Sequence, residues 1–278
     1  VLPFNAVVKD FVVTQGRYYM DGFDTQTADL SLDATWYDTK LEVQKFTAKH
    51  EIGAAEIVGS LNFDQYFDLN AKVQAHGATN DTTKALFEGV LYDLLANAEV
   101  SGNLTDLRLK SSLSLGGSTT LKARANVLSS ALPMRVSLQA QDFSYPIFAE
   151  EPLVNLQRIN LKSAGNLEDG VDVSLNSLVS GFDFENVATD LKAQISYEKS
   201  HIDHLVIDGL YQKEKLAANV SGDFFYGEIM GADAKIYAEV KDAGFLSPML
   251  KGPLMIDGDL VALLNQKEQG KSALSVAS

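Results

Sequence analysis

One cluster among the chain's four histidines has residue types suited to acid–base or metal chemistry: His201, Asp203 and His204. Imidazole and carboxylate groups transfer protons and bind zinc, but either role needs several groups that converge on one point. In an extended strand, His201 and Asp203 share one face while His204 points to the other. The neighbouring sequence supplies no third ligand. We therefore predict a solvated strand edge rather than a catalytic or metal site.

Other chemical motifs are not found in the sequence. The acidic segments 169–172 and 257–259 are too short for a calcium loop and are typical of turns. There is no glycine-rich phosphate loop, nucleophile elbow or zinc-protease motif. The chain contains no cysteine, which excludes disulfides, thiolate metal sites and cysteine nucleophiles. We expect no enzymatic activity, no cofactor and no metal.

The composition is that of a folded protein with an acidic surface. Hydrophobic residues make up 46% of the 278 residues and charged residues 22%. The chain has 37 acidic and 23 basic residues, a net charge of -14. Nucleic acid is not an expected partner, because a phosphate backbone binds clustered lysine and arginine. No apolar run reaches the roughly eighteen residues that a membrane-spanning helix needs.

The strongest structural signal is an apolar–polar alternation with a period of two. It continues through residues 105–115, 119–128 and 134–143, and returns at 68–76 and 171–178. Only a pleated strand places alternate side chains on one side, so the pattern predicts antiparallel hairpins with one apolar and one polar face. Large sheets twist and curl. We predict an all-β fold made of a long, mostly antiparallel sheet.

Two features interrupt this pattern. Residues 79–88 lose the period of two, and Asp81 is placed to cap a short helix there. A glycine followed by a polar and then an apolar residue recurs at 102–104, 165–167, 222–224 and 258–260. We expect each of these glycines to allow a kink or bulge in its strand.

The inward positions of the predicted strands are rich in alanine, and two interpretations follow. Either each alanine faces an aromatic residue and the core closes, or small side chains leave a long apolar cleft. Alkyl chains would fill such a cleft, gaining about 0.8 kcal/mol for each buried CH₂ group. The inward alanines are Ala71, Ala75, Ala96, Ala98, Ala123, Ala125, Ala193, Ala218, Ala232, Ala234 and Ala238. The candidate groove residues are Leu69, Val73, Leu94, Leu107, Leu109, Leu113, Leu115, Leu121, Ala123, Ala125, Val127, Val136, Leu138, Val173, Leu175, Leu191, Ile195, Leu216, Val220 and Ile236.

Five short motifs occur in order along the chain. They are LPMRVSL at 132–138, DFSYP at 142–146, LKSAGNL at 161–167, HLVIDG at 204–209 and GFLSPMLKG at 244–252. Together they resemble the amino-terminal half of the TamB family, one of the AsmA-like inter-membrane proteins of Gram-negative bacteria. The resemblance covers most of the chain, and it lies in the succession of motifs rather than in any one of them.

The resemblance implies a sheet bent into a U-shaped trough, or β-taco, with an apolar interior through which phospholipid moves between the inner and outer membranes. It also implies a longer periplasmic protein, anchored in the inner membrane by one amino-terminal helix. Such proteins assist autotransporter assembly with the outer-membrane barrel TamA, through a part of the chain absent here. We expect residues 1–278 to form a single elongated β domain, without that anchor or the carboxy-terminal domain.

Three hypotheses follow from the sequence. The first is a segment of a lipid-conducting periplasmic bridge. The second is a non-conducting structural scaffold with a closed β core in the same assembly, which would carry no bound lipid. The third is a carbohydrate-binding or adhesive sandwich, but the single Trp36 and the scattered tyrosines do not form the aromatic cluster it needs. Unpaired strands at 4–13 and 254–260 also predict end-to-end self-association of this fragment.

Overall fold

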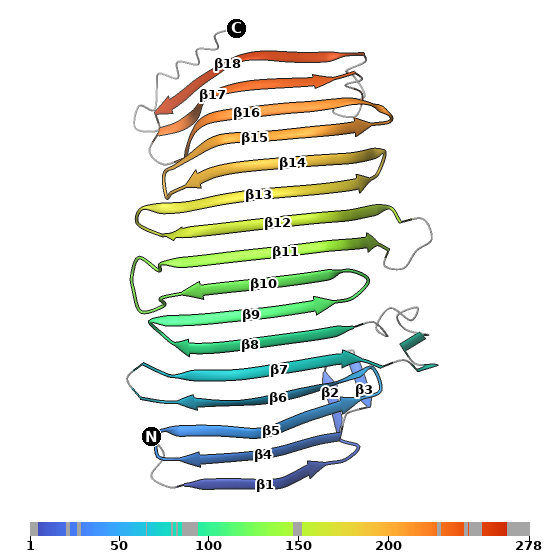
Figure 1. Ribbon diagram of the computed structural model, residues 1–278, viewed down its shortest axis with the longest axis vertical. Helices are drawn as coiled ribbons and strands as arrows, with labels where there is room; N and C mark the ends of the chain where they lie inside the picture. Colours follow the sequence, from blue (N-terminus) through green and yellow to red (C-terminus); the bar gives the residue numbers. More distant parts are fainter. Residues whose placement is uncertain are drawn as a thin grey trace. The chain divides into compact units, whose positions relative to one another are not determined.

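The computed structural model is built almost entirely of β-strands (Figure 1). It describes residues 5–20, 23–26, 29–64, 66–78, 80–81, 83–84, 94–146, 152–226, 229–241, 244 and 252–265. Backbone contacts divide the chain into two units, residues 1–129 and 130–278, and each unit is described by itself.

Unit 1 is an open antiparallel sheet with the strand order β1-β4-β5-β6-β7-β8-β9-β10. The strands β2 and β3 form a separate antiparallel hairpin. Apart from that hairpin, the sheet follows the order of the chain, as expected for a meander. The bounds are β1 Ala6–Val13, β2 Arg17–Met20, β3 Phe23–Gln26, β4 Asp29–Tyr37, β5 Lys40–His50, β6 Gly53–Asn62, β7 Leu69–Gly77, β8 Leu95–Asn103, β9 Asp106–Ser114 and β10 Ser118–Ala125.

Unit 2 is a second run of antiparallel strands, again in chain order from β11 to β18. Its strands are longer than most of those in unit 1, and they are joined by tight turns such as Phe182–Asp183 and Gln212–Lys213, whose residues all have positive φ. The bounds are β11 Met134–Tyr145, β12 Val154–Asn166, β13 Gly170–Gly181, β14 Phe184–Ile195, β15 Lys199–Tyr211, β16 Glu214–Tyr226, β17 Ile229–Val240 and β18 Leu254–Asn265.

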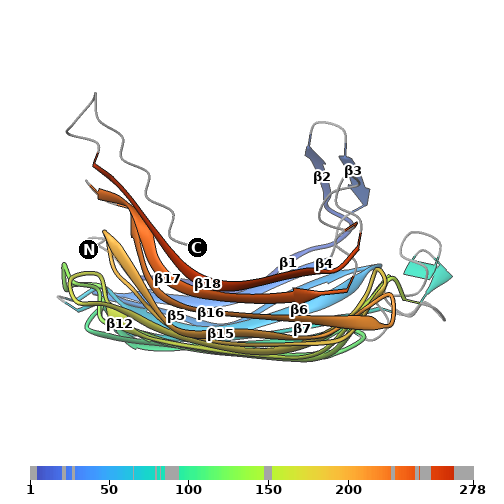
Figure 2. The ribbon, with the colours of Figure 1, turned by 90° about the horizontal axis from the view of Figure 1, so that it is seen from above.

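The predicted fold class is confirmed. The described strands pair antiparallel, and the sheet does not close on itself. Figure 2 shows that the strands bend along their length, so that each unit has a concave and a convex side. The prediction of a single elongated domain stays a prediction.

Some glycines adopt a backbone conformation that other residues rarely adopt. Gly222 in β16 has a φ of 139°, in a region that L side chains rarely adopt. A Cβ atom there would lie 2.3 Å from the carbonyl oxygen of Asp233 and 2.5 Å from the Cα atom of Ala234. The predicted irregularity is found beside Gly222, where the register of β15 and β16 shifts between Ile202 and Leu205. It is not found at Gly258, where β17 and β18 pair in unbroken register and a Cβ would meet no atom within 4 Å.

The interruption after β7 contains a helical turn, as the sequence predicts, but its cap lies one residue earlier. The Asn80 side-chain oxygen accepts a hydrogen bond from the Thr83 backbone N–H at 2.9 Å, and the Thr83 hydroxyl accepts one from the Asn80 N–H at 3.1 Å. This reciprocal arrangement is a capping box, so Asn80 is the cap and Asp81 is the first helical residue. Residues 85–93 lie outside the described ranges.

Candidate functional site

Strand register gathers the apolar side chains of each unit onto one face, which we call the apolar face; the other is the polar face. In unit 1, four cross-strand rows begin on β4 at Leu30, Leu32, Ala34 and Trp36 and run to β10. In unit 2, four rows begin on β11 at Met134, Val136, Leu138 and Ala140 and run to β18. A fifth begins at Phe143, is interrupted by the bulge between β14 and β15, and continues from Gly209 to β18. None of the described residues in these rows is charged.

The rows differ in side-chain size. The row from Leu30 has alanine on four successive strands, which we call the alanine row. The row from Leu138 has leucine on five successive strands, which we call the leucine row. The members are Ala48, Ala55, Ala75 and Ala96 in the alanine row, and Leu138, Leu161, Leu175, Leu191 and Leu205 in the leucine row.

The apolar face is the concave side of each unit. Its smallest side chains are shielded although the sheet has a single layer: Ala234 is only 3% exposed and Ala193 6%, whereas Ile195 in the same rows is 45% exposed. Only the β2–β3 hairpin, among the described strands, lies outside the sheet, so neighbouring side chains on the same face must do the shielding. Side chains converge on the concave side of a bent sheet and diverge on the convex side. The result is an open apolar floor in each unit.

Most of the predicted groove residues lie on this floor. Three lie beyond strand ends: Leu94 precedes β8, Leu115 follows β9, and Val127 follows β10 with 41% of its surface exposed. The residues that the register places in the rows are Leu69, Val73, Leu107, Leu109, Leu113, Leu121, Ala123, Ala125, Val136, Leu138, Val173, Leu175, Leu191, Ile195, Leu216, Val220 and Ile236.

Sequence reasoning missed floor residues that follow a β-bulge. In β12 the register shifts between Leu156 and Arg158, so that Leu156 and Ile159 share a face although three positions separate them. A bulge adds one residue and reverses the facing of everything after it, so counting in twos loses the phase. The sequence carried one signal of a bulge, the asparagine at position 186. Asn186 lies where the register of β14 and β15 shifts and has a φ of 51°, which asparagine tolerates better than most residues.

The same effect corrects the prediction for the histidine cluster. The register of β15 skips Asp203 against β14, which makes Asp203 a bulged residue. His204 therefore returns to the polar face beside His201 and lies 3.6 Å from Asp190. His201 lies between two carboxylates, with Nδ1 2.7 Å from Asp223 and Nε2 3.3 Å from Asp203. No group of three or more His, Asp or Glu residues in the described part of the chain is arranged to hold a metal.

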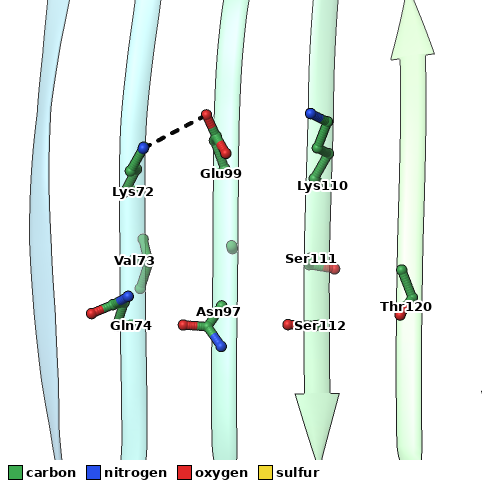
Figure 3. Close-up of a pocket in the computed structure, with 10 residues that line it drawn as sticks. Lys72, Val73, Gln74, Asn97, Glu99, Lys110, Ser111, Ser112 and Thr120 are labelled. Atoms are coloured by element: carbon green, nitrogen blue, oxygen red, sulfur yellow. Dashed lines mark ion pairs between the residues drawn. The ribbon is translucent and has the colours of Figure 1, made fainter.

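The polar face carries charges of both signs and shallow hollows. In unit 1 one hollow of about 350 Å³ lies across β7 to β10. Figure 3 shows its polar side chains, including the ion pair of Lys72 and Glu99 at 4.0 Å, with Val73 on the far side of the sheet. Nearby, Arg108 and Arg124 both donate hydrogen bonds to Asp106. The hydrogen bond from Arg108 has the largest effect and that from Arg124 the next largest. Together they lower the pKa of the Asp106 carboxyl to about 2.

The fold and both faces can now be compared with known proteins. Residues 1–221 match the family described as TamB, N-terminal domain. The chain belongs to the TamB family. No curated protein and no solved structure matches it. The part that matches the TamB family includes β1 to β15 and ends within β16, so it contains the apolar floor of unit 1 and most of that of unit 2. Within the described ranges, no helix has the length and hydropathy of a membrane span.

Proposed function

We propose that this TamB-family chain holds lipid acyl chains against its concave apolar face. The observation that supports the proposal is the continuity of that face: uncharged rows cross the sheet from β4 to β10 in unit 1 and from β11 to β18 in unit 2. An apolar surface of this extent left in water is costly, at about 25 cal/mol per Å². Burying about ten methylene groups against it would gain roughly 8 kcal/mol.

The form of the face suits movement better than fixed binding. The rows contain alkyl side chains with occasional hydroxyls, such as Ser177 opposite Thr189, and no ion that would hold a head group in one place. A lipid tail would therefore meet a nearly uniform surface, while its charged head group stays in water along the open side. We propose phospholipid transport between the inner and outer membranes as the process served.

The cellular setting belongs to the same proposal. We place the chain in the bacterial envelope, as a periplasmic segment of a longer protein that is anchored in the inner membrane. Its role in outer-membrane and autotransporter assembly would depend on TamA, contacted through a part of the protein outside this sequence. The chain would act without catalysis, as a surface that keeps acyl chains out of water.

The alternative of a closed, non-conducting scaffold has no specific observation in its favour. A closed core buries its large side chains nearly completely. Among the described residues, the buried hydrophobic ones are four alanines and one valine: Ala140, Ala193, Ala232, Ala234 and Val240. The larger side chains of the rows stay partly exposed, as expected of an open floor.

Trp36 gives a direct test of lipid contact. It is the chain's single tryptophan, it begins one of the rows of unit 1, and its ring stacks on Phe63 at a centroid distance of 5.0 Å. Bromine on an acyl chain quenches tryptophan fluorescence only at short range. We expect phospholipid with brominated tails to quench Trp36, and the same lipid without bromine to leave its intensity unchanged.

Native mass spectrometry of the purified chain is the control. It should detect bound phospholipid, which separates a failure of Trp36 as a reporter from a failure of lipid binding. A chain that carries no lipid and shows no quenching at any lipid concentration would contradict the proposed function.

A further inference from the structure

The polar face of unit 1 holds two pairs of like charges in direct opposition. On the hairpin β9–β10, Arg108 lies opposite Arg124, and Lys110 lies opposite Lys122. Like charges that face each other across antiparallel strands are destabilising. The cross-strand pairing therefore does not explain why four cations lie together on one hairpin. We call these four residues the cationic array.

Only one of the two pairs is compensated. Asp106 accepts hydrogen bonds from Arg108 and Arg124, so that pair shares a counter-ion. Lys110 and Lys122 form no ion pair with any described residue. The nearest acid in register with Lys110 is Glu99, but its ion pair is with Lys72. Both lysines are exposed.

Unit 2 carries the opposite arrangement on its own polar face. Asp233 lies directly opposite Asp223, and Asp257 and Asp259 alternate on the outermost described strand, β18. Asp223 has partners in Lys199 and His201. Asp233, Asp257 and Asp259 are exposed and form no ion pair among the described residues. We call these last three the acidic array.

We propose that the cationic array of one chain docks on the acidic array of a second copy. Charge complementarity between the two arrays favours a second copy of the chain as the partner. The cationic array keeps an excess of positive charge in a chain of net charge -14. The acidic array has one cation in register, Lys235 opposite Asp259, and keeps an excess of negative charge. Neither array contains an apolar anchor of the kind that inserts into a bilayer, which favours a polar protein surface over a membrane. The contact is independent of lipid binding on the apolar face.

Screening decides between local attraction and overall repulsion. Two copies of an acidic chain repel at long range, but at physiological ionic strength charges more than about 8 Å apart are largely screened. The charges in contact then dominate, and each exposed ion pair contributes little. The association should therefore be weak. It should be strongest at moderate salt, where long-range repulsion is screened, and should be lost at high salt.

Charge reversal in two matched variants tests the contact. Lys110→Glu with Lys122→Glu leaves two arginines and two glutamates in the first array, which then has no excess of positive charge. Asp257→Lys with Asp259→Lys leaves a chain whose arrays are both basic. By sedimentation velocity at about 0.15 M salt, each variant alone should self-associate at least about tenfold more weakly than the wild type. An equimolar mixture of the two should associate again, because each supplies the array that the other has lost.

Three outcomes would overturn the proposal. The first is a wild-type chain that stays monomeric at every concentration and salt. The second is a pair of folded variants, judged by circular dichroism, that associate as the wild type does, which would assign association to the strand edges. The third is a monomeric chain whose cationic array binds vesicles rich in anionic lipid, with binding lost in the Lys110→Glu, Lys122→Glu variant. In that case a membrane, not a second copy, is the partner.

Discussion

The two faces of a single strand differ in side-chain chemistry although they share one backbone. In β13, Val173, Leu175 and Ser177 lie in the rows of the apolar face, while Asp172, Ser174 and Asn176 alternate with them on the polar face. The backbone is the same, so only the side-chain pattern separates the faces. The apolar face is uniform over many strands, whereas the polar face changes its charge from one hairpin to the next.

This difference indicates where a substitution should matter. On a uniform floor, lipid contact depends on the continuity of the rows and not on any single residue. A substitution should matter only when it brings a charge or a bulge into the rows. On the polar face, many charges pair with an immediate neighbour, such as Lys215 with Glu239 at 2.6 Å. Exposed pairs of this kind contribute little to stability, because water and salt screen them. Large effects should therefore come from the apolar face and small ones from the polar face.

The largest effect should follow from a charge in the leucine row. Leu175→Asp places a carboxylate among leucines on three successive strands, and an unpaired ion in apolar surroundings is costly and attracts water. We expect bound phospholipid, measured by native mass spectrometry, to fall at least about tenfold. The matched control is Ser174→Asp, one residue away on the polar face, which should retain lipid. Equal retention by both variants would mean that the two faces do not differ in lipid contact.

The next effect concerns the backbone conformation of Gly222, which has a φ of 139°. Gly222→Ala forces a Cβ atom against the backbone of β17, and we expect a loss of about 3 kcal/mol in the free energy of unfolding, measured with urea. The control is Gly258→Ala, which meets open space and should cost about 0.5 kcal/mol or less. If the two variants unfold at the same urea concentration, the backbone conformation of Gly222 is not needed for the fold.

A smaller, pH-dependent effect is expected on the polar face of unit 1. The pKa of Asp106 is lowered from 3.8 to about 2 by its hydrogen bonds to Arg108 and Arg124. A lowered folded-state pKa gives stability that is present above pH 3.8 and is lost as the pH falls toward 2. Acid unfolding of Asp106→Asn should lack this component, so its stability should change less than that of the wild type in this window. Identical pH profiles would show that the arginine contacts do not persist in solution.

The smallest effect should come from a lysine on the polar face of unit 2. Lys162 lies between Ser137 and Ser174 in register and forms no ion pair among the described residues. We expect Lys162→Gln to change the free energy of unfolding by no more than about 0.5 kcal/mol. The amount of bound phospholipid, measured by native mass spectrometry, should equal that of the wild type. A marked loss of bound lipid in this variant would extend lipid contact to the polar face.

The sequence predicted what depends on local alternation. The period of two predicted the hairpin β9–β10 and the facing of Leu107, Leu109 and Leu113, because nothing in those strands disturbs the pleat. Prediction failed where long-range pairing inserts a residue. His204 was placed on the wrong face because the bulge at Asp203 depends on how β14 and β16 pair with β15, and not on β15 alone.

Two other features also depend on the folded chain. The shielding of Ala234 to 3% exposure results from the curvature of the sheet, which the alternation of residues does not specify. The cationic and acidic arrays were not predicted, because Lys110 and Lys122 become neighbours only through the register of two strands. A charge count along the chain therefore reports a net acidic protein and hides both arrays.

The central claim is that lipid contacts one face of the sheet and not the other. It is tested most directly by placing a photo-crosslinking residue at each successive position of β13, in the presence of phospholipid. The account predicts labelling with a period of two: lipid adducts at positions 173, 175 and 177, and none at 172, 174 and 176. Labelling of equal strength at all six positions would contradict it.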